Sequence, residues 1–389
     1  MPQSNPHWHA TLLTLAFRPF FLFGSLWAAV CVALWTGMLH GGLLLPSRFD
    51  PLSWHIHEML FGWILAAIAG FLLTAIPNWT GRPPVRGALL GALAAVWLAG
   101  RISGALSQFM PWWLAAALDI AFPVLLCTLA WREIIAGGNR RNLPMPIPVA
   151  VLGAASLLMH LRQAGFAIPD GLGWRLALAA VSILMAVIGA RIIPAFTRNW
   201  LAARRSPILP ASTRALDVAA TATLHAGLLA WAVLPQLRMI GILLIAAATL
   251  NLWRLWRWAG RAALAEPLLA ILHLGYGWLV AGAALLGVSQ LGAPGLQVAA
   301  VHALTAGAMG TMVLGVMTRV SLGHTGRPLA ADRMTAWIYA AISAAALLRI
   351  AAALMPAPRL LSLSAACWTL AFALFALRYA PLLLRPRLN

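Results

Sequence analysis

The sequence contains no lysine, and only 8 of its 389 residues are acidic, against 27 basic residues that are all arginine. Charged residues make up 9% of the chain and hydrophobic residues 62%, whereas a soluble domain usually carries about 25% charged residues. The arginines lie between apolar runs and form no compact basic domain, which argues against a nucleic-acid partner. This composition indicates a membrane protein with many spans, whose main contact is membrane lipid.

Cysteine is also scarce. Cys31, Cys127 and Cys367 all fall inside apolar runs, without the spacing of a disulfide framework or a CxxC metal site, so we interpret them as small core residues. No CxxCH motif occurs, which excludes covalently attached c-type haem. The first apolar run lacks the basic region and early cleavage site of a signal peptide, and we expect it to be retained.

Twelve apolar runs are long enough, or nearly so, to cross about 30 Å of hydrocarbon. They lie at residues 17–40, 57–77, 86–104, 112–131, 146–163, 174–195, 214–234, 239–253, 267–288, 297–318, 334–354 and 360–380. Pro, Gly and Arg mark the joins between them, and no linker is long enough to separate two soluble domains. We therefore predict an all-α polytopic membrane protein that forms a single membrane domain over residues 1–389.

The placement of the arginines predicts the orientation of these spans. With the N-terminus inside the cell, 19 arginines lie in cytoplasmic segments and 7 on the opposite side. Because an excess of basic residues marks cytoplasmic loops, we expect both termini to be cytoplasmic.

One spacing occurs twice in the sequence. His57 is followed 23 residues later by Thr80-Gly81-Arg82-Pro83, and His302 is followed 23 residues later by Thr325-Gly326-Arg327-Pro328. Each interval is a nearly uncharged apolar run of membrane-spanning length. The spacing therefore predicts two corresponding helices, each with an imidazole at the same end.

The sixth span resembles a degenerate third copy of this pattern. Its residues 193–197 are similar to residues 76–80, and Trp174 stands where the histidine would be. Because spans 2, 6 and 10 are four apart, the pattern predicts three pseudo-repeated four-helix arcs, roughly 1–131, 132–253 and 254–389. Chance is the alternative, since helix boundaries attract Gly, Arg and Pro.

Paired imidazoles at one membrane depth are the axial ligands that a haem iron needs. We therefore predict a haem b with His57 and His302 as the leading axial pair; the alternative is that these histidines cap backbone groups or anchor at the headgroups. Arg101 and Arg349 lie near the outer ends of their spans, where guanidinium groups suit haem propionates. Snorkelling towards lipid headgroups is the alternative for both arginines.

His55 lies two residues before His57, about 200° away around a helix, so the two imidazoles cannot face one iron. His55 competes with His57 as haem ligand, or it binds a second metal. Glu58 is three residues after His55, and we expect its carboxylate to orient the His55 ring.

Further candidates lie inside later spans. His225 follows Asp217 by two helical turns, which suggests a carboxylate-supported metal ligand or a proton route. His273 and Tyr276 share a helix face, which suits a second metal and proton donation. Asp119 is a candidate for a proton path, or for an ion pair with a helix arginine. Structural hydrogen bonds are the alternative reading for the histidines.

His324 occupies the place of Trp79 in the repeat, in a predicted cytoplasmic loop. It lies about 33 Å along the helix from His302, so the two cannot share a site. We expect His324 to serve a loop or an interface, although it is kept as a metal candidate. Four more histidines are interpreted as interfacial or packing residues: His7, His9, His40 and His160.

Three four-helix arcs with histidines on spans 2 and 10 resemble the catalytic subunit of haem-copper oxidases and nitric-oxide reductases. There is no HxH motif on span 10, however, and span 6 has no histidine. These departures argue against an oxidase-type binuclear centre.

The sequence resembles the NnrS family along nearly its whole length. The motifs that carry the resemblance are FRPFF at residues 17–21, WHIHEMLFG at 54–62, PNWTGRP at 77–83, HLGY at 273–276, HALT at 302–305 and LGHTGRP at 322–328. The resemblance implies a bacterial inner-membrane protein of twelve helices that contains haem and copper and is linked to denitrification and nitric-oxide stress.

We therefore expect a metalloprotein that binds or reduces nitric oxide at a haem b, with copper or a second haem as a further redox centre. Its electrons would come from a quinol or a redox-protein partner. The alternatives are a secondary transporter with structural histidines, and a non-catalytic haem sensor or assembly factor.

Overall fold

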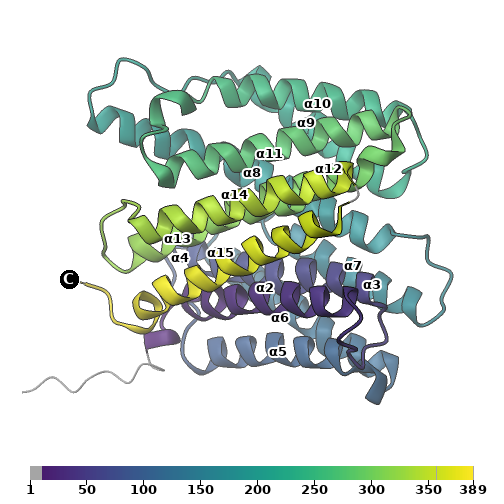
Figure 1. Ribbon diagram of the computed structural model, residues 1–389. Coiled ribbons are helices and arrows are strands. Elements are labelled where there is room, and N and C mark those ends of the chain that lie inside the picture. Colours follow the sequence, from purple (N-terminus) through teal and green to yellow (C-terminus); the bar gives the residue numbers. More distant parts are fainter. Residues whose placement is uncertain (1–10, 356, 389) are drawn as a thin grey trace, which may run out of the picture. The chain divides into compact units, whose positions relative to one another are not determined.

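The computed structural model describes residues 11–355 and 357–388, and Figure 1 shows its elements. Every regular element in this part of the chain is helical. Twelve helical segments are long and apolar enough to cross a membrane. The prediction of an all-α membrane protein with twelve spans is therefore confirmed, while His7 and His9 lie outside the described residues.

Most spans consist of one α-helix. They are α2 (Phe17–Leu39), α5 (Ala88–Ala105), α6 (Trp112–Ala136), α7 (Ile147–Gln163), α8 (Leu172–Ala203), α9 (Arg214–Val233), α10 (Met239–Trp256), α11 (Pro267–Gln290), α14 (Arg333–Leu354) and α15 (Pro358–Leu384). Short 3₁₀ turns stand at some of the joins, namely η2 (Ser107–Phe109), η3 (Arg140–Asn142), η4 (Gly260–Ala263) and η5 (Pro294–Leu296).

The chain forms two compact units, each described here by itself. Unit 1 comprises Met1–Ala177, Arg319–Pro328 and Phe372–Asn389, and unit 2 comprises Leu178–Thr318 and Leu329–Ala371. In unit 1, α6 packs against α4, α5 and α7. In unit 2, α10 packs against both α9 and α11. The orientation of the termini and the three pseudo-repeats stay predictions.

Two spans change helix type directly after their histidine. The second span consists of α3 (Pro51–His57), the π-helix η1 (Glu58–Ile64) and α4 (Leu65–Thr80). The tenth span contains α12 (Gln297–His302), the π-helix η6 (Ala303–Met309) and α13 (Gly310–His324). Each π-helix is seven residues long and follows the histidine without a gap. The spacing repeated in the sequence is thus also repeated in the backbone, and π-helical turns occur frequently at functional sites.

The ends of these two spans also correspond. Gly81 follows α4 with φ +69° and Gly326 lies two residues after α13 with φ +75°, the left-handed conformation that favours glycine at a helix end. The sixth span differs, because α8 runs as an uninterrupted α-helix from Leu172 to Ala203.

Arg18 stabilises the end of α15 within unit 1. Its side chain is 2% exposed, and Nη1 donates to the carbonyls of Leu383 and Arg385 at 2.7 and 2.8 Å. The last carbonyls of a helix lack intrahelical partners and carry the negative end of its dipole, so a buried cation suits them.

Arg18→Gln should therefore lower the free energy of unfolding by about 2 kcal/mol, because buried carbonyls lose a charged donor. Thermal unfolding in detergent would measure the change. Arg359→Gln, which removes an exposed arginine at the other end of α15, should change stability by no more than about 0.5 kcal/mol. Equal effects of the two substitutions would contradict the capping role of Arg18.

Candidate metal centre

A buried group of polar side chains from five elements converges in unit 1. We call it the histidine–carboxylate cluster, and it consists of His57 from α3, Glu58 from η1, Arg101 from α5, Asp119 from α6, and Ser156 and His160 from α7. No residue of the cluster is more than 3% exposed. Polar groups are this deeply buried in a membrane protein mainly where they pair with one another or serve a function.

Both ring nitrogens of His57 are engaged in the cluster. Nδ1 lies 3.1 Å from Glu58 Oε1, and Nε2 lies 3.2 Å from Asp119 Oδ2 and 3.2 Å from Ser156 Oγ. A carboxylate beside Nδ1 favours the proton on that nitrogen. Nε2 then faces Asp119 Oδ2, an acceptor that already takes the Ser156 hydroxyl proton, so a proton or a metal ion must lie between the two atoms.

His160 approaches the same carboxylate oxygen from α7. Its Nε2 lies 3.4 Å from Asp119 Oδ2 but forms no hydrogen bond of acceptable geometry there. One ligand atom from each of His57, Asp119 and His160 lies within 4.8 Å of the others. Two imidazoles and one carboxylate form a donor set that suits iron, copper or zinc.

Arg101 holds the two carboxylates in place. Its Nη1 donates to Glu58 Oε2 at 2.6 Å, and its Nη2 donates to Asp119 Oδ1. Trp27 Nε1 also donates to Glu58 Oε2, at 3.0 Å. With neutral imidazoles, two carboxylates and one guanidinium leave one net negative charge. A buried uncompensated charge is costly, so the cluster favours a bound cation or a proton.

Phe49 covers the cluster. Its ring centroid lies 5.0 Å from that of His57 and 5.1 Å from that of His160, and the residue is 7% exposed. Hydrogen bonds hold the segment before it, because Ser47 Oγ donates to Gly104 O at 2.9 Å and Arg48 Nε donates to Ser107 O at 2.9 Å. The aromatic ring excludes water from the cluster, which strengthens the electrostatic interactions inside it.

Asp50 caps the helix that carries His57. Its Oδ1 accepts from the backbone N–H groups of Leu52 and Ser53 at 3.0 and 3.1 Å. Partial burial acts to raise the pKa of Asp50, but the hydrogen bonds from Ser53 and Leu52 outweigh it and hold the pKa below its ordinary value. The charge on Asp50 therefore stabilises the folded protein fully at pH values above the ordinary pKa of an aspartate. This stabilisation is lost as the pH falls through the lowered pKa that Asp50 has in the folded protein.

Asp50→Ala should cost about 1 kcal/mol of stability at neutral pH, because two helix N–H groups lose their acceptor. The difference from wild type should become smaller as the pH falls through the folded-state pKa of Asp50, because a protonated carboxyl is a weaker acceptor than a carboxylate. Unfolding measured at several pH values checks both points. Asp50→Asn keeps an uncharged acceptor and should retain most of the stability at neutral pH; a full loss in that variant would contradict the capping role.

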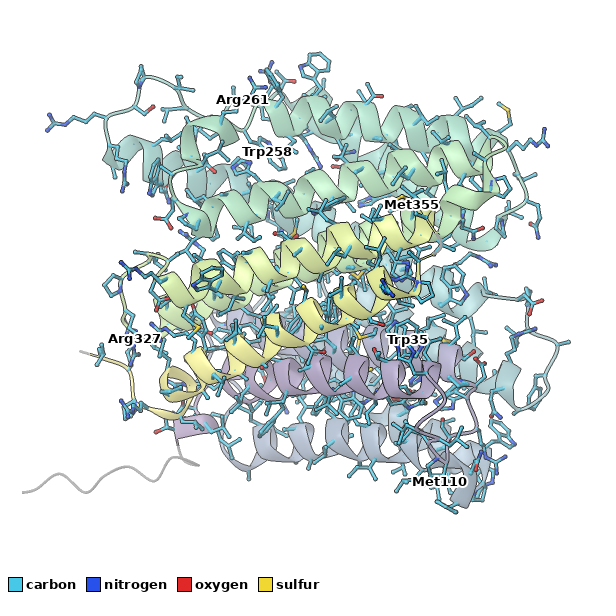
Figure 2. The ribbon with its side chains drawn as sticks, in the orientation of Figure 1. Trp35, Met110, Trp258, Arg261, Arg327 and Met355 are labelled. Carbon is cyan, nitrogen blue, oxygen red and sulfur yellow. The ribbon has the colours of Figure 1, made fainter. Side chains whose placement is uncertain are left out.

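His55 and His57 have different surroundings, as their spacing predicts. The His55 ring stacks on Trp35, with centroids 4.2 Å apart, and Figure 2 shows Trp35 near one end of α2. Glu58 accepts from His57, Trp27 and Arg101 rather than from His55, so the expected Glu58–His55 pair is corrected. The reason is that the π-helix begins at Glu58, and the Arg101 cation attracts the carboxylate.

In unit 2, His302 Nδ1 lies 2.8 Å from the carbonyl of Val298. This contact places the proton on Nδ1 and the lone pair on Nε2, the form in which histidine binds a metal. His273 Nε2 bonds Thr197 Oγ1 at 2.9 Å, and His225 lies beside the backbone of Ile183.

Four other predicted site residues do not belong to the histidine–carboxylate cluster. Asp217 accepts from Ser212 at 2.6 Å, and Tyr276 contacts Arg254. In unit 1, the His324 ring lies 5.6 Å from that of Phe17. Arg349 is half-buried on α14. Their assignment to a cofactor stays a prediction.

The roles of His160 and Ser156 were not predicted from the sequence. His160 was expected to be an interfacial or packing residue, whereas the structure buries it beside Asp119. One signal was present, because His57, Arg101 and His160 lie near the predicted outer end of their spans, and Asp119 lies about two helical turns inside its own span. Polar residues at one depth in neighbouring spans are candidates for one site.

The family model described as NnrS protein matches residues 11–387 of the chain. The chain belongs to the NnrS family. No curated protein matches the sequence. NnrS membership suggests a role in nitric-oxide-related metabolism, which partly confirms the function expected from the sequence.

The motifs shared with NnrS sequences have structural roles in this chain. FRPFF supplies the Arg18 cap on α15, and WHIHEMLFG supplies His57, Glu58 and the start of η1. In Figure 2, Arg327 of the second TGRP motif lies at the opposite end of unit 1 from Trp35 and Met110. The motifs of unit 1 that carry the NnrS resemblance therefore lie at both ends of the unit. The histidine–carboxylate cluster lies at the end that holds WHIHEMLFG.

Proposed function

We propose that this NnrS protein is a membrane metalloprotein of nitric-oxide metabolism that holds a metal ion with His57, Asp119 and His160. The observation that carries the proposal is the meeting of these three buried ligand groups within 4.8 Å. With neutral imidazoles the cluster carries one net negative charge, which a metal cation would compensate in place of a proton on His57. The His160 Nε2 atom has no hydrogen-bond partner among the described residues, and a metal ion would provide one.

Iron or copper at this position would supply nitric-oxide binding and one-electron transfer. The protein groups do the remaining work. Glu58 holds the proton on His57 Nδ1 and leaves Nε2 for the metal. Arg101 takes Asp119 Oδ1 and leaves Oδ2 facing the histidines. Phe49 keeps the site dry and leaves it suited to a small uncharged ligand such as nitric oxide.

Haem b stays part of the proposal, with His302 as the candidate ligand, because its Nδ1 contact leaves Nε2 able to bind iron. The contacts of His57 favour the metal ion, since a haem at His57 Nε2 would have to replace Asp119 and Ser156. We propose that the protein lies in the bacterial inner membrane with both termini cytoplasmic and receives electrons from a quinol or a redox protein.

Elemental analysis of the purified protein tests the metal centre. We expect about one equivalent of iron or copper beyond that bound in haem, which pyridine haemochrome spectra count separately. His160→Ala and Asp119→Asn should lower the occupancy of that metal at least about tenfold, because each removes a ligand. His40→Ala, at an exposed histidine, should leave it unchanged.

Nitric-oxide binding is then followed by electron paramagnetic resonance. The signal of nitric oxide at the non-haem metal should be present in wild type and in His40→Ala and absent in His160→Ala. Wild-type protein without a non-haem metal, or full metal content in His160→Ala, would contradict the proposed centre. His302→Ala should lose haem while keeping the non-haem metal.

A further inference from the structure

A group of arginines gathers where the second TGRP motif meets the C-terminal segment in unit 1. We call it the arginine cluster, and it consists of Arg327 after α13, Arg378 in α15, and Arg385 and Arg387 after α15. Arg385 and Arg387 are exposed, and Arg327 and Arg378 are half-buried. Figure 2 shows Arg327 at the end of unit 1 opposite to Trp35, so the arginine cluster is separate from the histidine–carboxylate cluster.

Backbone contacts hold the C-terminal segment against the TGRP turn. The N–H of Leu388 donates to the Thr325 carbonyl at 3.0 Å. Gly326 permits this close approach, because an added Cβ there would stand 2.5 Å from Leu388 O and 3.4 Å from Arg387 Cγ. Arg327 directly follows this glycine. Arg327 and Arg387 are therefore brought together by folded backbone and not by a loose chain end.

Arg378 and Arg385 belong to the same group. The carbonyl of Arg385 accepts from Arg18 Nη1 at 2.8 Å, which fixes the backbone at the end of α15. Arg378 lies seven residues earlier, about two helical turns, so both arginines are on one side of α15. Burial and the nearby charges of Arg378 and Arg385 lower the pKa of Arg327. The four arginines therefore repel one another unless an anion lies among them.

The first TGRP motif provides an internal comparison. Its arginine, Arg82, donates to the carboxylate of Glu133 at 2.6 Å. Arg327 has the same place in the second motif, but its Nη1 contacts only the carbonyl of Thr325 in its own turn, at 3.3 Å. Within the described part of the chain, Arg327, Arg385 and Arg387 form no ion pair. One copy of the motif thus pairs its arginine with a carboxylate, and the other places it beside further cations.

The predicted orientation of the spans does not account for this grouping. An arginine marks a cytoplasmic segment wherever it stands in that segment. Bringing four arginines from two segments together adds a repulsion that separate positions would avoid. A bound anion removes that repulsion, and the planar guanidinium group suits the oxygens of a phosphate. The grouping therefore indicates an anionic partner that carries phosphate.

The surface beside the arginine cluster is apolar. Leu377, next to Arg378 in α15, is 71% exposed, and Leu388, next to Arg387, is 52% exposed. A phospholipid carries its phosphate beside its acyl chains, whereas a free phosphate ion has no apolar part, so this surface favours the lipid. We propose that the arginine cluster binds the phosphate headgroup of an anionic phospholipid, with Leu377 against the acyl chains.

This inference goes beyond the proposed metal centre and does not depend on it. The arginine cluster shares no residue with the histidine–carboxylate cluster and lies at the other end of unit 1. Loss of metal therefore does not test lipid binding, and failure of lipid binding leaves the proposed metal centre unaffected.

Native mass spectrometry of the full-length protein, purified in detergent and stripped of co-purified lipid, tests the proposal. Phosphatidylglycerol and phosphatidylcholine with the same acyl chains serve as probes, because only the first has a net negative headgroup. We expect wild type to bind phosphatidylglycerol at least about tenfold more tightly, and this preference should shrink as the ionic strength rises. Arg327→Gln/Arg385→Gln should lower the affinity for phosphatidylglycerol at least about tenfold.

Arg140→Gln/Arg141→Gln is the matched control, because it removes the same charge from two exposed arginines in η3 of unit 1. Its affinity for phosphatidylglycerol should stay within about twofold of wild type. Thermal unfolding with inorganic phosphate gives the second arm. Phosphate should change the unfolding temperature no more than sodium chloride of equal ionic strength does.

The proposal is overturned if wild type binds the two lipids equally well, or if the control variant loses as much affinity as Arg327→Gln/Arg385→Gln. It is also overturned, in favour of a free anion, if inorganic phosphate stabilises wild type in a saturable way but not Arg327→Gln/Arg385→Gln. If that double variant does not fold, Arg387→Gln at an exposed position decides the question. It should lower the affinity at least about threefold, and an unchanged affinity would overturn the proposal.

Discussion

The Arg101→Gln protein should unfold with a free energy about 3–5 kcal/mol below that of wild type. The substitution removes the one cation that contacts both Glu58 and Asp119, which are 0% and 2% exposed. Two carboxylates would then be buried without a compensating charge, and glutamine supplies fewer donors in their place. Denaturant titration in detergent, followed by circular dichroism, measures the loss.

Arg132→Gln is the control for this prediction. Arg132 also contacts a glutamate, Glu133, but its side chain is 57% exposed, and exposed ion pairs contribute about 0–1 kcal/mol. The double variant Glu58→Gln/Arg101→Gln removes one of the stranded charges and should recover part of the stability lost in Arg101→Gln, which a double-mutant cycle detects. If Arg101→Gln costs no more than Arg132→Gln, the cluster is not the electrostatic centre described here.

The spans were predictable because hydropathy is a local property of the sequence. The predicted runs 112–131 and 239–253 correspond to α6 (Trp112–Ala136) and α10 (Met239–Trp256). The second span begins earlier than predicted, at Pro51 rather than residue 57. The segment before His57 mixes apolar residues with Ser53 and His55, so hydropathy marks no sharp start there, and the Asp50 cap sets where the helix begins.

The site was only partly predictable. His57 was found because the spacing to TGRP is repeated at His302, and the predicted ion pair between Asp119 and a helix arginine was among the alternatives considered. His160 belongs to no repeated spacing. From the sequence alone, a single histidine near a helix end that faces lipid headgroups cannot be told from one that faces a metal. Its role depends on the packing of α6 against α7, which no local pattern encodes.

The two π-helices could not be predicted from the sequence either. The second prediction with a large expected effect concerns Gly62 in η1. Gly62 lies in η1, where an added Cβ would stand 2.6 Å from Trp27 Nε1, 2.9 Å from Arg101 Nη1 and 2.9 Å from Glu58 Oε2. These atoms are already bonded to one another in the buried cluster. Gly62→Ala must therefore displace the Glu58 carboxylate or its donors.

We expect Gly62→Ala to lower the free energy of unfolding by about 3 kcal/mol, although alanine is the better helix former by about 1 kcal/mol. Gly277→Ala isolates that propensity term, because Gly277 lies in α11 and an added Cβ there would meet only Leu255 Cδ2, at 3.9 Å. It should leave stability unchanged or raise it. The proposed metal should also be lost from Gly62→Ala, since His57 Nδ1 depends on the position of Glu58. A Gly62→Ala protein as stable as the Gly277→Ala protein would contradict this prediction, because it would mean that the hydrogen bonds of Glu58 tolerate the added methyl group.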